Sequence, residues 1–79
     1  MQEKIRDILA SHGKMPVDPR EIAADADLYE LGLTSHASVN VMLALEDEFD
    51  IEFPDGDLRK STFATVDNLA AVIGRLVSA

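Results

Sequence analysis

Ser35 is the residue whose type and position point most directly to chemistry. It follows Gly32-Leu33-Thr34, where a long loop meets a helix that we expect over residues 35–50. Serine is a preferred N-cap, so capping is one explanation of the residue. The same position would expose the hydroxyl to a modifying enzyme and set an attached phosphoryl group against free N–H groups and the positive end of the helix dipole. Position alone leaves both roles open.

Other chemistries find little support in the sequence. Ser35 and His36 do not make a hydrolase pair, because adjacent helical residues point about 100° apart and no third group or Gly-x-Ser-x-Gly elbow is present. The acidic stretches at residues 25–27 and 55–57 do not continue into calcium loops, and His12 and His36 lack the spacing of zinc ligands. With no cysteine in the chain, thiolate chemistry is excluded. The sequence predicts a protein that holds no metal and catalyses no reaction alone.

Acidic residues are concentrated in the middle of the chain. The 79 residues include 15 acidic and seven basic side chains, for a formal net charge of −8. Residues 21–57 hold eleven of the acids and no Lys or Arg. Such a surface repels nucleic acid and anionic membranes, which we exclude as partners, and attracts basic proteins. Solubility alone is the other explanation.

Composition and length predict one small globular domain over residues 1–79. Apolar residues make up 47% of the chain and charged residues 28%, the balance of a folded protein. The sequence starts without an apolar signal-peptide region, and its longest apolar runs, residues 41–45 and 69–73, are too short to cross a bilayer. We therefore expect a cytoplasmic protein, and a monomer.

Helical periodicity dominates the pattern of apolar residues. Spacings of three and four predict a first helix over residues 1–12, ended by Gly13 with a positive φ, and a second helix over residues 35–50. A short turn or a one-turn helix is expected around residues 57–61, and Thr65 is expected to cap the last helix. The expected fold is an all-α bundle of three main helices plus one short helix.

The second helix carries residues that a core helix does not need. Val39 and Leu43 widen its apolar stripe beyond a single buried face. Glu46, Asp47 and Glu48 crowd its last turns, where the helix dipole disfavours each negative charge by up to roughly 1 kcal/mol. Unfavourable local choices of this kind tend to mark function. We expect these residues to dock partners, and neutralising the three acids to leave folding intact; a solvated rim and ordinary core are the alternative.

Together these segments resemble the acyl carrier protein family. The resemblance is carried by residues 30–35, 39, 43–49 and 53–55, which fall in register without gaps. In that family, the serine of an Asp/Glu-Leu-Gly-x-Asp-Ser-Leu signature receives 4′-phosphopantetheine, and Ser35 matches that serine. Thr34 and His36 stand where aspartate and leucine are usual. We expect both residues to contact partners: Thr34 affects recognition by the phosphopantetheinyl transferase, and His36 places its ring beside the arm. A solvated surface residue is the alternative for His36.

The resemblance also implies a way of working. A covalent 4′-phosphopantetheine arm from coenzyme A would hold an acyl or aminoacyl group as a thioester, while partner enzymes perform the chemistry. The implied partners are a phosphopantetheinyl transferase, an acyl- or aminoacyl-activating ligase and a downstream transferase or synthase. The departures at Thr34 and His36 favour an aminoacyl or secondary-pathway cargo over bulk fatty acids. The alternative is an unmodified acidic interaction module with a degenerate carrier fold. The two hypotheses differ only in whether the Ser35 hydroxyl carries a modification.

Overall fold

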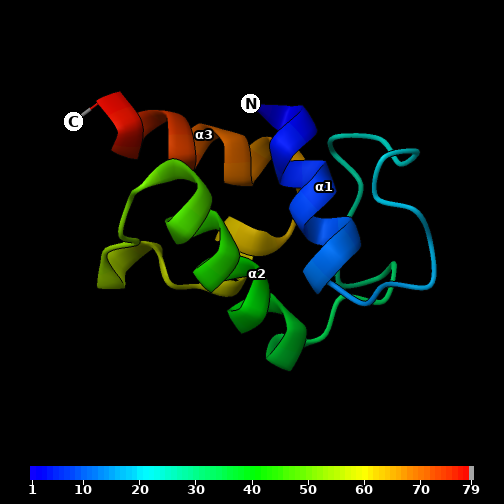
Figure 1. The fold of residues 1–79 in the computed structure, drawn as a ribbon. Coiled ribbons are helices and arrows are strands. Elements are labelled where there is room, and N and C mark those ends of the chain that lie inside the picture. The colour runs from blue at the N-terminus through cyan, green and yellow to red at the C-terminus, as the bar shows by residue number, and fades with distance from the viewer. Residues whose placement is uncertain (79) are drawn as a thin grey trace.

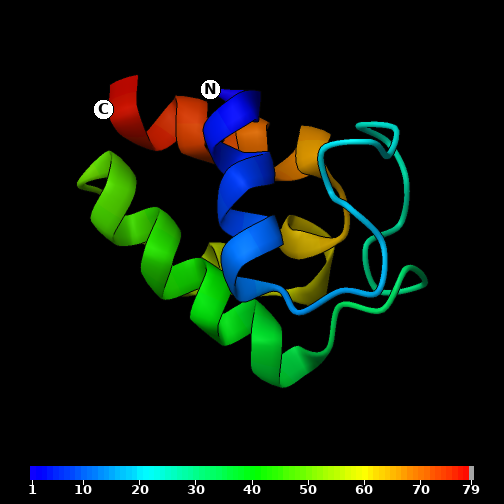
Figure 2. The ribbon, with the colours of Figure 1, turned by 45° about the vertical axis from the view of Figure 1, so that its right-hand side comes forward.

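Three α-helices and two short 3-10 turns make up the fold. The computed structural model describes residues 1–78, with α1 at Gln2–His12, α2 at Ser35–Phe49, η1 at Asp55–Asp57, η2 at Lys60–Phe63 and α3 at Val66–Ser78. α3 lies across the amino-terminal end of α1, so the N-terminus and the end of α3 share one side of the molecule (Figures 1 and 2). The expected all-α architecture is confirmed, and no helix within residues 1–78 is long and apolar enough to cross a bilayer.

The segment between α2 and α3 differs from the expectation of one short helix at residues 57–61. It forms two 3-10 turns, because the backbone between them leaves the helical region: Leu58 has ψ 68° and Arg59 is extended at φ −138°, ψ 160°. The first turn is tied to α3 by Asp57, whose Oδ1 accepts a hydrogen bond of 2.8 Å from Arg75 Nη2. This ion pair fixes the segment that returns the chain from α2 toward α3.

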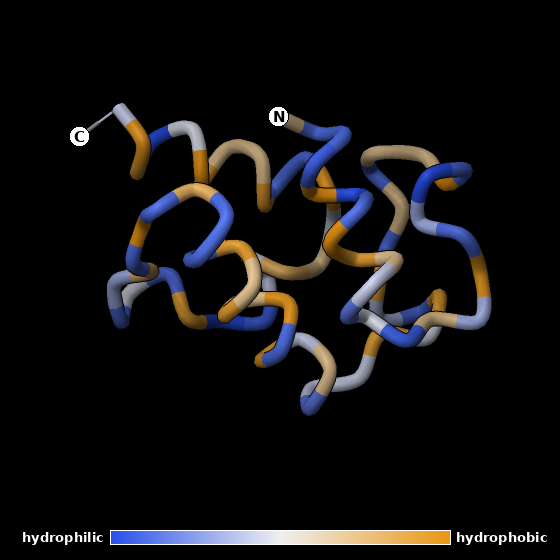
Figure 3. The backbone as a smooth tube through the Cα atoms, viewed as in Figure 1, coloured by the Kyte–Doolittle hydropathy of each residue, from blue (hydrophilic) through white to orange (hydrophobic). Residues whose placement is uncertain are grey.

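An apolar core joins the helices. Apolar and hydrophilic residues alternate along the helices (Figure 3), as amphipathic packing requires. Thr65 caps α3 as predicted, its Oγ1 accepting a hydrogen bond from Asn68 N at 3.0 Å. The buried apolar side chains come from all three helices and from the segments between them: Ile5, Ile8, Leu9, Leu28, Leu33, Ala37, Val41, Leu45, Phe53, Phe63, Val66, Leu69 and Ile73.

Gly13 ends α1, but the expected positive φ is wrong. Its φ is −76°, an ordinary right-handed value. Glycine is needed for space, since a Cβ there would lie 2.6 Å from Leu9 O. The left-handed residue comes one position later, at Lys14 with φ 52°.

Residues 13–34 form an irregular loop that is hydrogen-bonded to α1 and to the segment between η2 and α3. Arg6 Nη1 on α1 donates to Pro19 O at 2.8 Å and to Ile22 O at 2.6 Å. Near the end of the loop, Leu28 N donates to Ala64 O at 2.7 Å. Because the loop runs directly into α2, these contacts determine where the start of α2 lies.

Candidate functional site

Thr34, and not Ser35, caps α2. Thr34 has extended backbone angles, φ −94° and ψ 161°, and its Oγ1 accepts a hydrogen bond from Ala37 N at 3.0 Å. Ser35 is the first helical residue and is exposed, and within residues 1–78 its hydroxyl takes part in no hydrogen bond. The capping explanation of Ser35 is therefore wrong, because the preceding threonine already occupies that role. The Ser35 hydroxyl is left free.

The chain approaches Ser35 through a constrained turn. Gly32 has φ +112°, a backbone conformation that residues with a side chain rarely adopt. A Cβ at this position would lie 2.4 Å from Pro16 Cδ. The next residue, Leu33, is buried, and its N–H donates to Leu28 O at 2.9 Å. A buried Leu33 two residues before Ser35 anchors the junction, while the serine itself faces outward.

A groove of about 390 Å³ opens beside Ser35. Its walls come from the loop, from the first turns of α2 and from the segment around η2. Lys60 lies over the ring of Tyr29, with Nζ 4.9 Å from the ring centroid. The groove is lined by Tyr29, Ser35, Ser38, Val39, Met42, Leu58, Arg59, Lys60 and Phe63.

The acidic end of α2 is not uniform. Glu46 is half-buried, and its Oε2 accepts a hydrogen bond from Phe53 N at 2.9 Å. Asp47 is exposed, and Glu48 Oε1 lies 3.9 Å from Lys4 Nζ in an exposed ion pair. Glu46 therefore holds the chain that follows α2, and the expectation that neutralising all three acids leaves folding intact does not extend to it.

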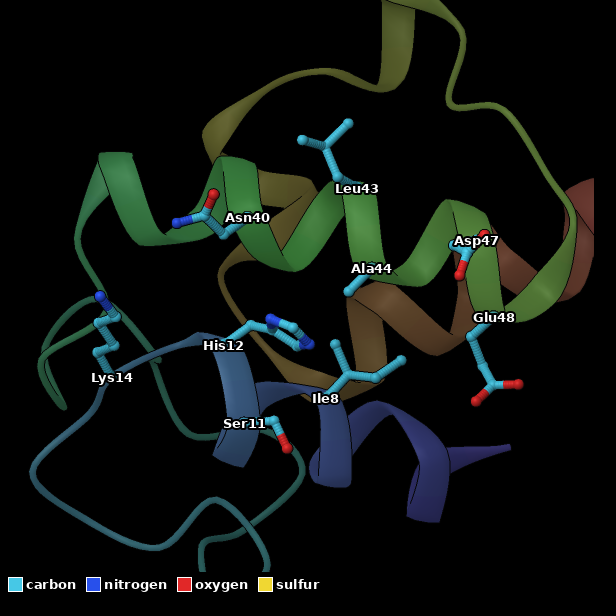
Figure 4. A pocket seen from close by; sticks show the side chains of 9 residues that line it. All are labelled: Ile8, Ser11, His12, Lys14, Asn40, Leu43, Ala44, Asp47 and Glu48. Carbon is cyan, nitrogen blue, oxygen red and sulfur yellow. The ribbon is translucent and has the colours of Figure 1, made fainter.

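The apolar residues expected on the outside of α2 are exposed. Val39 is 51% exposed and Leu43 is 54% exposed. Val39 faces the groove beside Ser35, whereas Leu43 lines a second groove of about 600 Å³ between α1 and α2. Figure 4 shows the His12 ring of α1 turned toward α2 in this second groove, with Asp47 and Glu48 to one side of it. The predicted docking residues thus extend along most of α2.

The histidines do not combine into a metal site. His36 is exposed in the first turn of α2, and His12 lies at the end of α1. In the part of the chain that the structure describes, no group of three or more His, Cys, Asp or Glu side chains could hold a metal ion.

The structure adds three residues to the site that the sequence analysis did not select. Tyr29 precedes Ser35 by six residues, whereas Arg59 and Lys60 are far from it in sequence, and all three line the same groove. One signal pointed to the two cations: Arg59 and Lys60 end the long stretch that contains no Lys or Arg. Only the folded chain shows that they lie beside the serine.

The helical fold with a free serine at the start of α2 is that of a carrier protein. The family model described as "Phosphopantetheine attachment site" matches residues 3–73. The aminoacyl carrier protein of Agrobacterium fabrum is 50% identical over 66 residues, which cover 84% of this chain and 80% of that protein. The chain therefore belongs to the phosphopantetheine attachment site family of carrier proteins.

Solved structures support the same assignment. A chain in the crystal structure of an engineered Bradyrhizobium japonicum glycine:[carrier protein] ligase, complexed with carrier protein from Agrobacterium tumefaciens and AMP, matches with a TM-score of 0.91. That match is 44% identical and covers 94% of this chain and 99% of the other. A structure of the Bradyrhizobium japonicum ligase complexed with glycylated carrier protein matches with a TM-score of 0.77 at 27% identity, covering 90% and 95%.

These comparisons confirm the main predictions about class. The protein is a carrier that bears an acyl or aminoacyl group as a thioester on 4′-phosphopantetheine. It is a substrate of other enzymes and not itself a catalyst. The comparisons do not identify the attachment residue or the docking residues.

Proposed function

We propose that Ser35 carries the phosphopantetheine arm and that the protein is an aminoacyl carrier of the cytoplasm, loaded with glycine or a similarly small amino acid by a separate ligase. The observation that carries the proposal is that Thr34, and not Ser35, caps α2. Thr34 Oγ1 accepts the capping hydrogen bond from Ala37 N at 3.0 Å, so modification of the exposed Ser35 hydroxyl breaks no capping hydrogen bond.

The surroundings of Ser35 suit this modification. Its hydroxyl lies at a helix N-terminus, where first-turn N–H groups and the helix dipole favour the negative phosphodiester. The groove beside it is open and largely apolar, which suits an uncharged pantetheine chain. Once attached, the arm supplies a thiol, which this cysteine-free chain lacks.

An aminoacyl cargo is supported by the relatives and by the residues on either side of Ser35. The similar Agrobacterium protein is an aminoacyl carrier protein, and the similar solved chains are carrier proteins complexed with a glycine:[carrier protein] ligase. Thr34 and His36, on either side of the serine, are the departures from the fatty-acid carrier pattern.

The outer surface of α2 is the proposed docking surface for the phosphopantetheinyl transferase, the ligase and a downstream transferase or synthase. Val39 and Leu43 supply exposed apolar contacts. Asp47 and Glu48 supply exposed negative charge that attracts basic patches and gives salt-sensitive binding. Such contacts allow rapid exchange between successive partner enzymes.

Intact-mass measurement tests the attachment. The protein is incubated with coenzyme A and a broad-specificity phosphopantetheinyl transferase, with Ser35→Ala and Ser38→Ala alongside. Ser38 is the matched control, because it is a serine of the same helical turn whose Oγ donates to Ser35 O at 2.7 Å. We expect one phosphopantetheine on the wild type and on Ser38→Ala, and none on Ser35→Ala. No mass gain with several transferases would instead support the unmodified interaction module.

A second step tests the cargo. The protein bearing phosphopantetheine is incubated with ATP, a glycine:[carrier protein] ligase and glycine or another small amino acid. In parallel, it is incubated with fatty acids and an acyl-activating ligase. We expect a hydroxylamine-sensitive mass gain with the amino acid. Loading by the fatty acid alone would contradict the aminoacyl assignment and leave the attachment residue in place.

A further inference from the structure

The largely apolar groove beside Ser35 has a basic edge, in a protein whose formal net charge is −8. Its charged lining residues are Arg59 and Lys60, and no Asp or Glu is among its lining residues. Residues 21–57, which include α2 and the turn before it, hold eleven acids and no Lys or Arg. The fold thus brings two positive charges from beyond this acidic stretch into the groove that Ser35 lines.

Neither cation is paired with a carboxylate of residues 1–78. Within residues 1–78, the ion pairs involve Lys4, Arg20 and Arg75, and no carboxylate lies within 4.0 Å of the charged groups of Arg59 or Lys60. Both residues are exposed. Their charge is therefore available to a ligand that enters the groove.

Lys60 is nevertheless held in place. Its Nζ lies 4.9 Å from the centroid of the Tyr29 ring, and Tyr29 packs against the core. A cation–π contact of this kind fixes the position of an ammonium group without cancelling its charge. Since η2 begins at Lys60, the backbone of this residue is also ordered. A long, flexible lysine is thereby kept at the edge of the groove beside Ser35.

We propose that Arg59 and Lys60 form a binding site for the phosphodiester of the arm on Ser35, with Tyr29 as the residue that positions Lys60. This inference rests on the proposed attachment at Ser35. A phosphodiester carries one negative charge and several acceptor oxygens, which guanidinium and ammonium groups bind through charge-assisted hydrogen bonds. Beyond the two cations, Val39, Met42 and Phe63 offer an apolar wall to the pantetheine chain. The site would hold the near part of the arm along the groove.

The test compares the unmodified and modified proteins by NMR after intact mass has shown complete loading. We expect loading to shift the amide signals of Arg59, Lys60 and Tyr29 in the wild type, and to order the carbon atoms of a ¹³C-labelled arm near the phosphate. Raising the salt concentration should release the arm, because exposed charge pairs are screened.

Variants separate this site from general charge effects. In Lys60→Gln and Arg59→Gln the expected result is loss of the order of the arm, whereas Lys60→Arg should retain it. Lys14→Gln is the matched control, since it removes one exposed lysine that lines the other groove. Circular dichroism checks that the helices are intact in each variant.

Two results would overturn the proposal, and they are distinguishable. A fully loaded wild type whose Arg59, Lys60 and Tyr29 signals do not move would refute the phosphate site and leave the attachment at Ser35 standing. A protein that gains no mass would refute both. Equal loss of order in Lys14→Gln and Lys60→Gln would show that only overall charge matters, which also contradicts a site in this groove.

Discussion

The two ends of α2 follow opposite rules. At the amino-terminal end, Thr34 satisfies the backbone with a side-chain cap, and the dipole favours the negative group that we propose for Ser35. At the carboxyl-terminal end, Glu46, Asp47 and Glu48 oppose the dipole, and the helix closes at Asp50 in a left-handed conformation, φ 51°. One end is locally stabilised, and the other is locally strained.

At each end of α2, one residue stabilises the fold and an adjacent residue remains available for function. Thr34 serves the helix, and Ser35 is free. Glu46 serves the fold through Phe53 N, while Asp47 and Glu48 face solvent. In each pair the residue with a hydrogen bond to the backbone should matter for stability, and its outward neighbour should matter for loading or docking.

The largest effect on stability is expected at the approach to the amino-terminal end. Gly32→Ala should lower the free energy of unfolding by about 2–3 kcal/mol, because the backbone is at φ +112° and the new Cβ would lie 2.4 Å from Pro16 Cδ. Urea unfolding measures the change. Gly56→Ala is the matched control, since a Cβ there meets no atom within 4 Å. Equal stability of the two variants would contradict the proposed constraint.

At the carboxyl-terminal end, the next largest effect belongs to Glu46. Glu46→Ala should cost about 1–2 kcal/mol, since Phe53 N loses its charged acceptor in a half-buried position. Glu46→Gln keeps an acceptor oxygen and should recover a large part of the loss. Urea unfolding compares the two variants. If Glu46→Ala were as stable as the wild type, the hydrogen bond to Phe53 would contribute nothing to stability. Glu46 would then have no structural role that distinguishes it from Asp47 and Glu48.

Sequence patterns predicted the elements of the fold well where the information is local. Apolar spacing gave the three helices, and Thr65 was predicted as the cap that the structure shows. Capping of α2 was considered for Ser35 and not for Thr34, although both residue types cap helices and the two are adjacent. Nothing in the local pattern distinguishes them, and one residue of register decides which hydroxyl is free.

The parts that sequence could not predict depend on contacts between distant segments. Glu46 reads as one of three equivalent acids until the chain folds back and places Phe53 N at 2.9 Å from its carboxylate. Lys60 and Tyr29 are 31 positions apart in the sequence, yet they meet beside Ser35. Helical periodicity carries no information about such pairs, since it describes one element at a time.

A smaller effect is expected from removing the cap of α2. Thr34→Ala should lower the free energy of unfolding by about 1 kcal/mol, which corresponds to about 4–8 °C in Tm for a domain of this size. Thr34→Ser, which keeps the hydroxyl, should restore most of it. Attachment of phosphopantetheine to Ser35 should persist in both variants. Intact mass measures it after incubation at a temperature where both are folded. Loss of loading in Thr34→Ser without loss of stability would show that the threonine methyl group contacts the transferase.

The smallest effect on stability is expected at the outward-facing acids. In the double variant Asp47→Asn/Glu48→Gln, the free energy of unfolding should stay within a few tenths of a kcal/mol of the wild type or rise slightly. Repulsion from the helix dipole is relieved, while the exposed contact of Glu48 with Lys4, at 3.9 Å, contributes little. Thermal unfolding measures this, and titration with the ligase measures affinity, which should fall and become less dependent on salt.

A change of net charge alone could also weaken binding to a basic partner, so the place of the charge needs its own control. Glu21→Gln/Asp25→Asn removes the same two charges from exposed positions in the loop before α2. If docking uses the surface of α2, affinity should fall much more in the Asp47/Glu48 variant than in this one. Equal losses would mean that the acidic middle of the chain acts only through its total charge. The unfavourable acidic residues at the carboxyl-terminal end of α2 would then serve solubility and not docking.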